Sequence, residues 1–287
     1  MEVIGNMKKA YRILVTGASS GIGFDTAKQL AQAGHTVFAA ARRVELMEPL
    51  REFGVTPLRL DVCDEKAIDE CLEATGPIDV LVNNAGFGYF GAIETVPMEE
   101  ARRQLEVNIF GLATLCRKVL PGMRERGFGR IINISSVAGR TCMYFGGWYH
   151  VSKYSVEALS DCLRMELRPF GIDVVLIEPG GIRTDWGIIA AKHLAESSAG
   201  TAYEEEALRQ SVVMDRGYTS QLLAKPSAVT RAIVRAVKAR RPRVRYLVGS
   251  GARSMVFWHA VLPARWWDAL MRKIASPGLV KIAKKLK

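Results

Sequence analysis

A glycine-rich turn near the N-terminus constrains the fold of this chain more than any other stretch. It follows an apolar run at residues 12–16 and precedes a helical pattern that opens at Gly21 and runs to Gly34. Glycines permit a tight turn and close approach of the backbone, while a helix N-terminus offers free N–H groups and a positive dipole end to a pyrophosphate. The sequence therefore predicts a strand–turn–helix unit that binds phosphate, through Gly17, Ser19, Ser20, Gly21, Ile22 and Gly23.

Apolar runs and helical patterns alternate after this turn. We expect further strands at residues 36–41, 56–60, 78–82, 130–134, 173–177 and 243–248, with helices that include residues 98–126 and 149–168. This alternation predicts βαβ units and a mostly parallel sheet of about seven strands in a doubly wound α/β fold. Ligands bind such folds outside the carboxyl ends of the strands, where the polar motifs of this sequence lie.

Tyr149 and Lys153 stand four residues apart, one turn from each other on one face of a predicted helix. The cation would favour the phenolate, so Tyr149 would exchange a proton near neutral pH instead of near its usual pKa of ~10. Ser136 follows a predicted strand and would add a hydroxyl, so that the three groups together polarise and protonate a carbonyl. An isolated Tyr–Lys pair of this spacing is also compatible with a solvated helix face, so its surroundings decide.

Five motifs agree in identity and order with the classical short-chain dehydrogenase/reductases, and together they span residues 11–184. The sequence resembles that family, in particular its steroid- and retinoid-type members, in the glycine-rich turn, Asn83-Asn84-Ala85-Gly86, Ser136, the Tyr149/Lys153 pair and Pro179-Gly180-x-x-x-Thr184. The resemblance implies a Rossmann-like fold with helices on both faces of the sheet. It also implies a nicotinamide cofactor and hydride transfer between an alcohol and a carbonyl.

The same resemblance implies roles for single residues. Tyr149 would be the general acid/base, Lys153 would lower its pKa and hold the nicotinamide ribose, and Ser136 would donate to the substrate oxygen. Asn108 would hold a water in the proton relay, although it could instead bond backbone groups of its own helix. The further cofactor contacts that the resemblance implies are Asp61, Val62, Asn84, Ala85, Gly86, Pro179, Gly180, Ile182 and Thr184.

The end of the second predicted strand favours NADP(H) over NAD(H). Dinucleotide folds place an acid there to bind the ribose 2′-hydroxyl, but here Arg42 and Arg43 follow the strand, with no acid before Glu45. A guanidinium can hold a 2′-phosphate with paired N–H donors. We predict Arg42 as the main contact; the alternative is that both arginines simply begin a solvated helix.

Aromatic side chains near the strand ends predict an apolar substrate pocket, with Phe87, Tyr89, Tyr144, Trp148 and Trp186 as candidate contacts. The helical pattern weakens at about residues 185–225 into short helical pieces, which favours a mobile lid over a plain surface excursion. The expected substrate is a lipophilic secondary alcohol, or an aldehyde/alcohol pair, and its carbonyl. A 3-oxoacyl thioester is the alternative, and the same aromatics could instead hold the lid down.

The net charge of +11 is concentrated near the C-terminus. Residues 231–287 hold fifteen Lys or Arg and one acid, Asp268, so residues 1–230 carry 25 basic and 28 acidic side chains. We expect an NADP-binding domain at residues 1–250 and a basic, tryptophan-rich helical extension at residues 251–287. Tryptophans beside Lys and Arg are typical of a helix in a membrane interface, unless these aromatics cap the core or a neighbouring subunit.

Other classes of protein fit the sequence less well. The charge permits non-specific nucleic-acid binding, but no nucleic-acid motif is present, so no such partner is expected. There is no apolar run long enough to span a membrane and no secretory signal, and five scattered cysteines form no metal pattern. We therefore expect a cytoplasmic enzyme without a metal, and the family resemblance implies a homodimer or homotetramer.

Overall fold

The strands of the protein form one parallel sheet, with seven strands within residues 10–275. A computed structural model describes residues 10–275, and the strand order in its sheet is β3-β2-β1-β4-β5-β6-β7. This doubly wound, Rossmann-like arrangement confirms the predicted fold class. The strands are β1 (Arg12–Thr16), β2 (Thr36–Ala41), β3 (Thr56–Arg59), β4 (Val80–Asn83), β5 (Gly129–Ile134), β6 (Ile172–Pro179) and β7 (Arg245–Val248).

Helices cover both faces of the sheet, because each parallel connection must cross over one face. On one face, α1 (Gly21–Gln32) and α8 (Ser227–Lys238) bury apolar side chains such as Leu30 and Ile233 against the strands. On the other face lie α2 (Glu65–Thr75), α4 (Leu112–Glu125) and α5 (Gly147–Leu167). The strands alternate between these two cores; Ile13 packs into the first and Leu14 into the second.

The long helix expected at residues 98–126 is interrupted in its middle. It comprises α3 (Met98–Leu105), a π-helical segment η2 (Glu106–Gly111) and α4. Such π-helical insertions occur frequently at functional sites because they redirect side chains. Here the insertion contains Asn108, and Gly111 ends it where a Cβ would lie 2.5 Å from the carbonyl oxygen of Val62. Elsewhere within residues 10–275, 3₁₀ segments follow β2, β5 and α5; they are η1 (Val44–Phe53), η3 (Val137–Gly139) and η4 (Arg168–Phe170).

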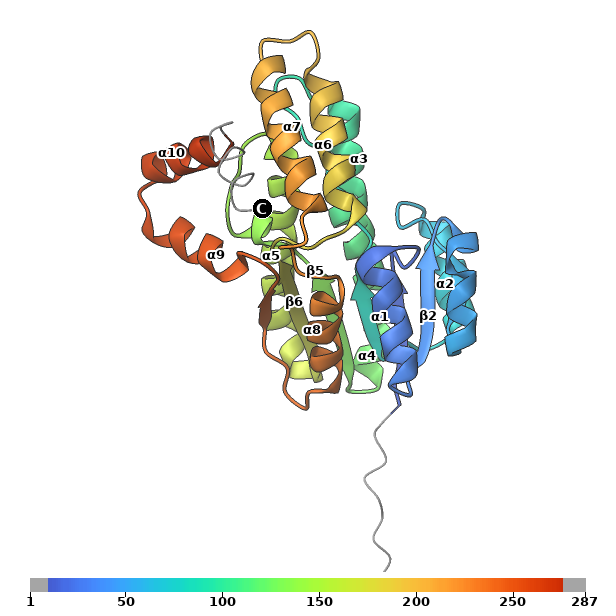
Figure 1. Cartoon of the computed structure of the whole chain (residues 1–287). Helices are drawn as coiled ribbons and strands as arrows, with labels where there is room; N and C mark the ends of the chain where they lie inside the picture. The colour runs from blue at the N-terminus through green and yellow to red at the C-terminus, as the bar shows by residue number, and fades with distance from the viewer. Residues whose placement is uncertain (1–9, 276–287) are drawn as a thin grey trace, which may run out of the picture.

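Two full helices occupy the segment that was expected to contain only short helical pieces. They are α6 (Asp185–Ser198) and α7 (Glu204–Thr219), which stand side by side above the carboxyl ends of the strands (Figure 1). The sequence pattern looks weak because small residues form much of the buried face; Gly187, Ala190, Ala207 and Ser211 are all buried. The expectation of short pieces is therefore wrong.

The C-terminal extension contains the helices α9 (Ala252–Val261) and α10 (Ala264–Ala275), which project to one side of the sheet (Figure 1). Trp267 is buried and its indole N–H donates to the carbonyl of Cys142 at 2.8 Å, just before α5. One tryptophan of the tail thus packs on the protein, as one of the alternatives expected. Lys281, Lys284, Lys285 and Lys287 lie outside the described residues. Within residues 10–275, no helix combines the length and apolarity needed to cross a bilayer.

Candidate active site

The glycine-rich turn is held against the end of β4 by hydrogen bonds between side chains and backbone and by close packing of the backbone. Asn84 donates from its side-chain amide to the carbonyls of Thr16 (3.0 Å) and Gly17 (3.1 Å), and Thr16 Oγ1 accepts from the backbone N–H of Ala85 at 3.1 Å. A Cβ on Gly17 would lie 2.8 Å from Ala85 Cα, and one on Gly23 only 2.4 Å from the carbonyl oxygen of Gly17. Only glycine fits at these two positions, as the close-approach interpretation predicts.

The N-terminus of α1 has the properties of a phosphate site. Ser20 occupies the N-cap position without a side-chain hydrogen bond, and the first turn contains no acid that would repel an anion. The first N–H groups of the helix therefore keep their capacity to bind one. Gly21, at φ +56°, faces Thr184, whose methyl group would lie 3.8 Å from an added Cβ. The turn and the loop after β6 thus enclose the same space, and these residues fit a nicotinamide dinucleotide.

The corner at the ends of β2 and β3 combines basic and acidic groups. Arg42 and Arg43 are exposed directly after β2, and no acid ends that strand. Asp61 accepts from the backbone N–H of Cys63 at 3.0 Å. Burial and the Asp61 carboxylate raise the pKa of the Cys63 thiol to about 11, while Arg42 opposes this shift. Arg42 and Asp61 therefore both affect the Cys63 thiol and lie in the same corner. The sequence predicts the adenosine half of the cofactor there.

Ser136, Tyr149 and Lys153 meet at the carboxyl ends of β5 and β6. Ser136 caps η3 by accepting from Ala138 N at 3.1 Å, donates to the carbonyl of Pro179 at 3.3 Å, and is hydrogen-bonded with Tyr149. Lys153 donates to the carbonyl of Ile134 at 2.8 Å, and its Nζ lies 5.9 Å from the centroid of the Tyr149 ring. The structure thus brings together the three groups that the sequence predicts for proton transfer.

The pKa of Tyr149 moves in the direction opposite to the one expected. Burial raises it well above the usual range, the hydrogen bond with Ser136 opposes that shift, and the nearby Tyr218 adds to it. Burial also lowers the pKa of Lys153 to about 8, although the Glu157 carboxylate acts against this. The net shift is therefore upward in this arrangement, because exclusion of water disfavours the charged phenolate.

Asn108 links two loops of the site. Its carboxamide accepts from the backbone N–H of Phe87 at 3.1 Å and donates to the Phe87 carbonyl at 2.9 Å and to Ser152 Oγ at 3.0 Å. These partners lie after β4 and on α5, so the alternative that Asn108 bonds only its own helix is wrong. A Cβ on Gly86 would lie 3.0 Å from Asn108 Oδ1 and 3.8 Å from Lys153 Nζ, which puts both residues beside the same glycine.

Three aromatic rings surround Tyr149. The centroids of Trp186 and Phe90 lie 4.9 Å and 5.6 Å from that of Tyr149, and Tyr218 lies 6.0 Å from Trp186. Tyr218, at the end of α7, was not among the predicted site residues, and nothing local in the sequence marks it. Only the packing does: a Cβ on Gly187 would lie 2.0 Å from Tyr218 Cγ, so the ring rests directly on α6.

The other predicted substrate residues lie at varied distances from this centre. Phe87 packs under the guanidinium of Arg103 (4.6 Å), and Tyr89 stacks on His193 at 4.7 Å, so these rings engage α3 and α6. Tyr144 packs on Phe145 at 4.3 Å. Trp148 neighbours Tyr149 in the chain, and its buried indole N–H has no hydrogen-bond partner within residues 10–275.

Comparison with known proteins agrees with this geometry. The family model described as short chain dehydrogenase matches residues 11–194. The chain belongs to this family. A probable short-chain type dehydrogenase/reductase VdlC of Helicobacter pylori is 34% identical over 265 residues, covering 91% of this chain and 96% of that protein. A 3-ketodihydrosphingosine reductase of Bacteroides thetaiotaomicron is 35% identical, covering 83% and 87% of the two chains.

Solved structures extend the match to the three-dimensional fold. A short-chain dehydrogenase from Streptomyces avermitilis superposes with a TM-score of 0.76 at 33% identity, covering 88% of this chain and 93% of that one. The closed form of a serine dehydrogenase complexed with NADP+ gives a TM-score of 0.71 at 29% identity, covering 81% and 92%. This member of the short-chain dehydrogenases is therefore an oxidoreductase with a nicotinamide dinucleotide site.

Proposed function

We propose that the protein is an NADP(H)-dependent oxidoreductase that interconverts a lipophilic alcohol and its carbonyl, with Tyr149 as general acid/base. The observation that carries this proposal is the buried phenol of Tyr149, hydrogen-bonded with Ser136 and surrounded by Phe90, Trp186 and Tyr218. A titratable group in an apolar, strand-end site suits proton transfer to an apolar substrate.

In the direction of reduction, the substrate carbonyl oxygen accepts hydrogen bonds from Ser136 and Tyr149. A nicotinamide held by these residues would supply the hydride for the carbonyl carbon. The phenol of Tyr149 is protonated at neutral pH even at its usual pKa of ~10, so it gives its proton to the developing alkoxide as a general acid. The rings of Phe90, Trp186 and Tyr218 exclude water from this proton transfer.

Lys153 and Asn108 support this step. The Lys153 ammonium, 5.9 Å from the ring centroid, stabilises the phenolate that remains after Tyr149 has lost its proton. Lys153 and Asn108 both lie beside Gly86, at the mouth of the loop after β4, where the family resemblance puts the ribose and a relay water. Gly17, Gly21 and Gly23 would hold the diphosphate by backbone approach, and Asn84 keeps their turn in place.

The preference for NADP(H) rests on Arg42 and Arg43, exposed after a strand that ends without an acid. The similarity to a serine dehydrogenase complexed with NADP+ supports it. We expect Arg42→Ala to lower the ratio of kcat/KM for NADPH over NADH by at least about tenfold, the loss of one charge-assisted contact. Arg51→Ala, which removes an exposed guanidinium elsewhere, is the control. An unchanged ratio in Arg42→Ala would remove Arg42 from this role.

The lining of the site supports the proposed substrate class. Trp186 and Phe90 present apolar rings to Tyr149. The similarity to a 3-ketodihydrosphingosine reductase also favours a lipophilic ketone. A 3-oxoacyl thioester remains the second candidate. Measuring NADPH oxidation with a panel of lipophilic ketones, aldehydes and 3-oxoacyl thioesters distinguishes the two substrate classes.

Replacement of Tyr149 by Phe tests the mechanism. Phe keeps the ring contacts with Trp186 and Phe90 and removes only the hydroxyl, so NADPH binding should persist while kcat falls by about a thousandfold. The measurement is turnover of the best panel substrate, with NADPH binding followed by calorimetry. Normal turnover in this variant would exclude Tyr149 as the general acid/base.

A further inference from the structure

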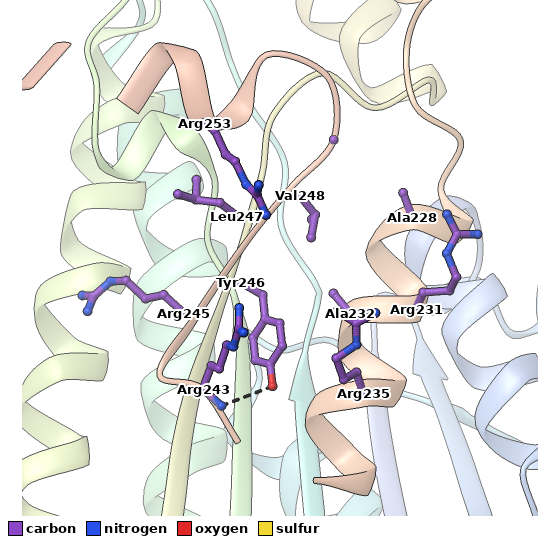
Figure 2. A pocket seen from close by; sticks show the side chains of 11 residues that line it. Ala228, Arg231, Ala232, Arg235, Arg243, Arg245, Tyr246, Leu247, Val248 and Arg253 are labelled. Carbon is purple, nitrogen blue, oxygen red and sulfur yellow. Dashed lines mark hydrogen bonds between the residues drawn. The ribbon is translucent and has the colours of Figure 1, made fainter. Parts of the chain in front are cut away.

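A groove rich in arginines lies between α8 and the outer edge of β7, away from Tyr149. Its volume is about 440 Å³, and Figure 2 shows the side chains that line it. Ala232 and Val248 form part of an apolar floor, and the OH of Tyr246 accepts from the backbone N–H of Arg243 at 3.2 Å. β7 is the last strand of the sheet, so this edge has no neighbouring strand within residues 10–275.

Most of the arginines of this groove have no acidic partner. Arg245 points to the other side of β7 and is engaged by Glu157, Asp161 and Glu178. In contrast, four exposed arginines form no ion pair within the part of the chain that the structure describes: Arg231, Arg235, Arg243 and Arg253. Guanidinium groups gathered without acids favour an anionic ligand with several acceptor oxygens.

The groove continues into an apolar helix face. A second hollow of about 470 Å³ shares Leu247, Gly249 and Arg253 with the first and lies beside the start of α9. Phe257 and Val261 follow Arg253 at intervals of four residues, so they lie on the same face of α9. Both are more than half exposed, at 57% and 53%. The surface therefore combines an anion-binding end with a ridge of exposed apolar side chains.

We propose that the groove and α9 form one surface that binds membranes containing anionic phospholipid. The unpaired arginines would hold the phosphate headgroup, and Phe257 and Val261 would enter the boundary between headgroups and acyl chains. A second copy of the chain at the β7 edge is disfavoured because two such surfaces would bring like charges together. Nucleic acid or a soluble phosphate would leave the apolar ridge of α9 without a role.

Co-sedimentation of the full-length protein with vesicles tests this proposal. We expect binding to vesicles of phosphatidylcholine mixed with phosphatidylglycerol, and little binding to phosphatidylcholine alone. The triple variant Arg235→Gln, Arg243→Gln, Arg253→Gln should weaken binding by about a hundredfold, since each basic residue near an anionic surface contributes about one kcal/mol. Phe257→Ser should also weaken it, with unchanged thermal unfolding in both variants.

A matched control removes the same charge from the other edge of the sheet. The triple variant Arg51→Gln, Lys66→Gln, Arg117→Gln changes exposed side chains on η1, α2 and α4, and it should bind vesicles like the wild type. Equal loss in both triple variants, or equal binding by wild type and the groove variant, overturns the proposal. So does binding of inorganic phosphate or of short duplex DNA that depends on the groove arginines, when the vesicles leave the protein in the supernatant.

Discussion

Two regions of the site are stabilised by different contacts. We call the glycine-rich turn at residues 17–23 together with Asn84 the cradle, and the helices α6 and α7 the cover. The cradle is packed through its backbone. Gly23 lies so close to Gly17 that a Cβ would lie 2.4 Å from the Gly17 carbonyl oxygen, and the side-chain amide of Asn84 donates to the same carbonyl. The cover is packed through aromatic side chains. The ring centroid of Trp186 lies 4.9 Å from that of Tyr149 and 6.0 Å from that of Tyr218.

This difference separates two tasks. Backbone contacts leave almost no freedom for substitution, because a carbonyl oxygen cannot move without shifting a strand or a helix. Aromatic contacts tolerate exchange and sliding, since side chains can repack around a different ligand. With the proposed function, the cradle would fix the cofactor and the cover would adapt to a substrate. The same small substitution in both regions should expose the contrast.

The largest effect is expected from Gly23→Ala. The added methyl group meets the carbonyl of Gly17 and the side-chain amide of Asn84, so affinity for NADPH should fall by about a hundredfold, or about 3 kcal/mol. Calorimetric titration measures it. Gly217→Ala in α7 is the control, because its Cβ meets nothing within 4 Å; it should leave cofactor affinity unchanged. Wild-type affinity in Gly23→Ala would break the comparison.

The pKa of the buried Lys153 tests whether water is excluded where the cradle and the cover meet. Its pKa is about 8 in the folded protein and 10.5 ordinarily, so between these values the unfolded chain binds more protons and stability rises with pH. The free energy of unfolding of the wild type should gain about 2 kcal/mol over Lys153→Met from pH ~7 to pH ~9.5.

Denaturant unfolding at both pH values measures this gain. Lys66→Met serves as the control, because the Lys66 side chain is 85% exposed and should show no such pH-dependent difference from the wild type. A parallel pH dependence in the wild type and Lys153→Met would mean that water reaches Lys153.

Gly187→Ala should give the smallest effect and act on the cover alone. Its Cβ would lie 2.0 Å from Tyr218 Cγ, so the ring must move and the cover must shift over Tyr149. We expect KM for the best ketone to rise by about tenfold, with NADPH affinity unchanged. Steady-state kinetics and calorimetry check both. Gly187→Ala combined with Tyr218→Ala should recover part of the loss; a fall in NADPH affinity would contradict the separation of the two regions.

Much of the cradle could be predicted from local sequence because its motifs are contiguous and each lies at the end of a strand. The turn from Gly17 to Gly23 and the pair Tyr149/Lys153 are examples, and the structure puts both at the carboxyl edge of the sheet. The cover was harder to predict. Small residues on the buried faces of α6 and α7 weaken the apolar periodicity, and Tyr218 reaches the site only through the packing of these two helices.

The doubly wound fold, the glycine-rich turn after β1 and the basic C-terminal region can all be read from the sequence, because periodicity, spacing and charge are local properties. Tertiary structure decided the rest. It set the direction of the pKa shift of Tyr149, since the phenol is buried among Phe90, Trp186 and Tyr218. It also decided which arginines are paired, because Arg245 finds three acids on neighbouring elements while Arg235 and Arg243 face a groove that holds none.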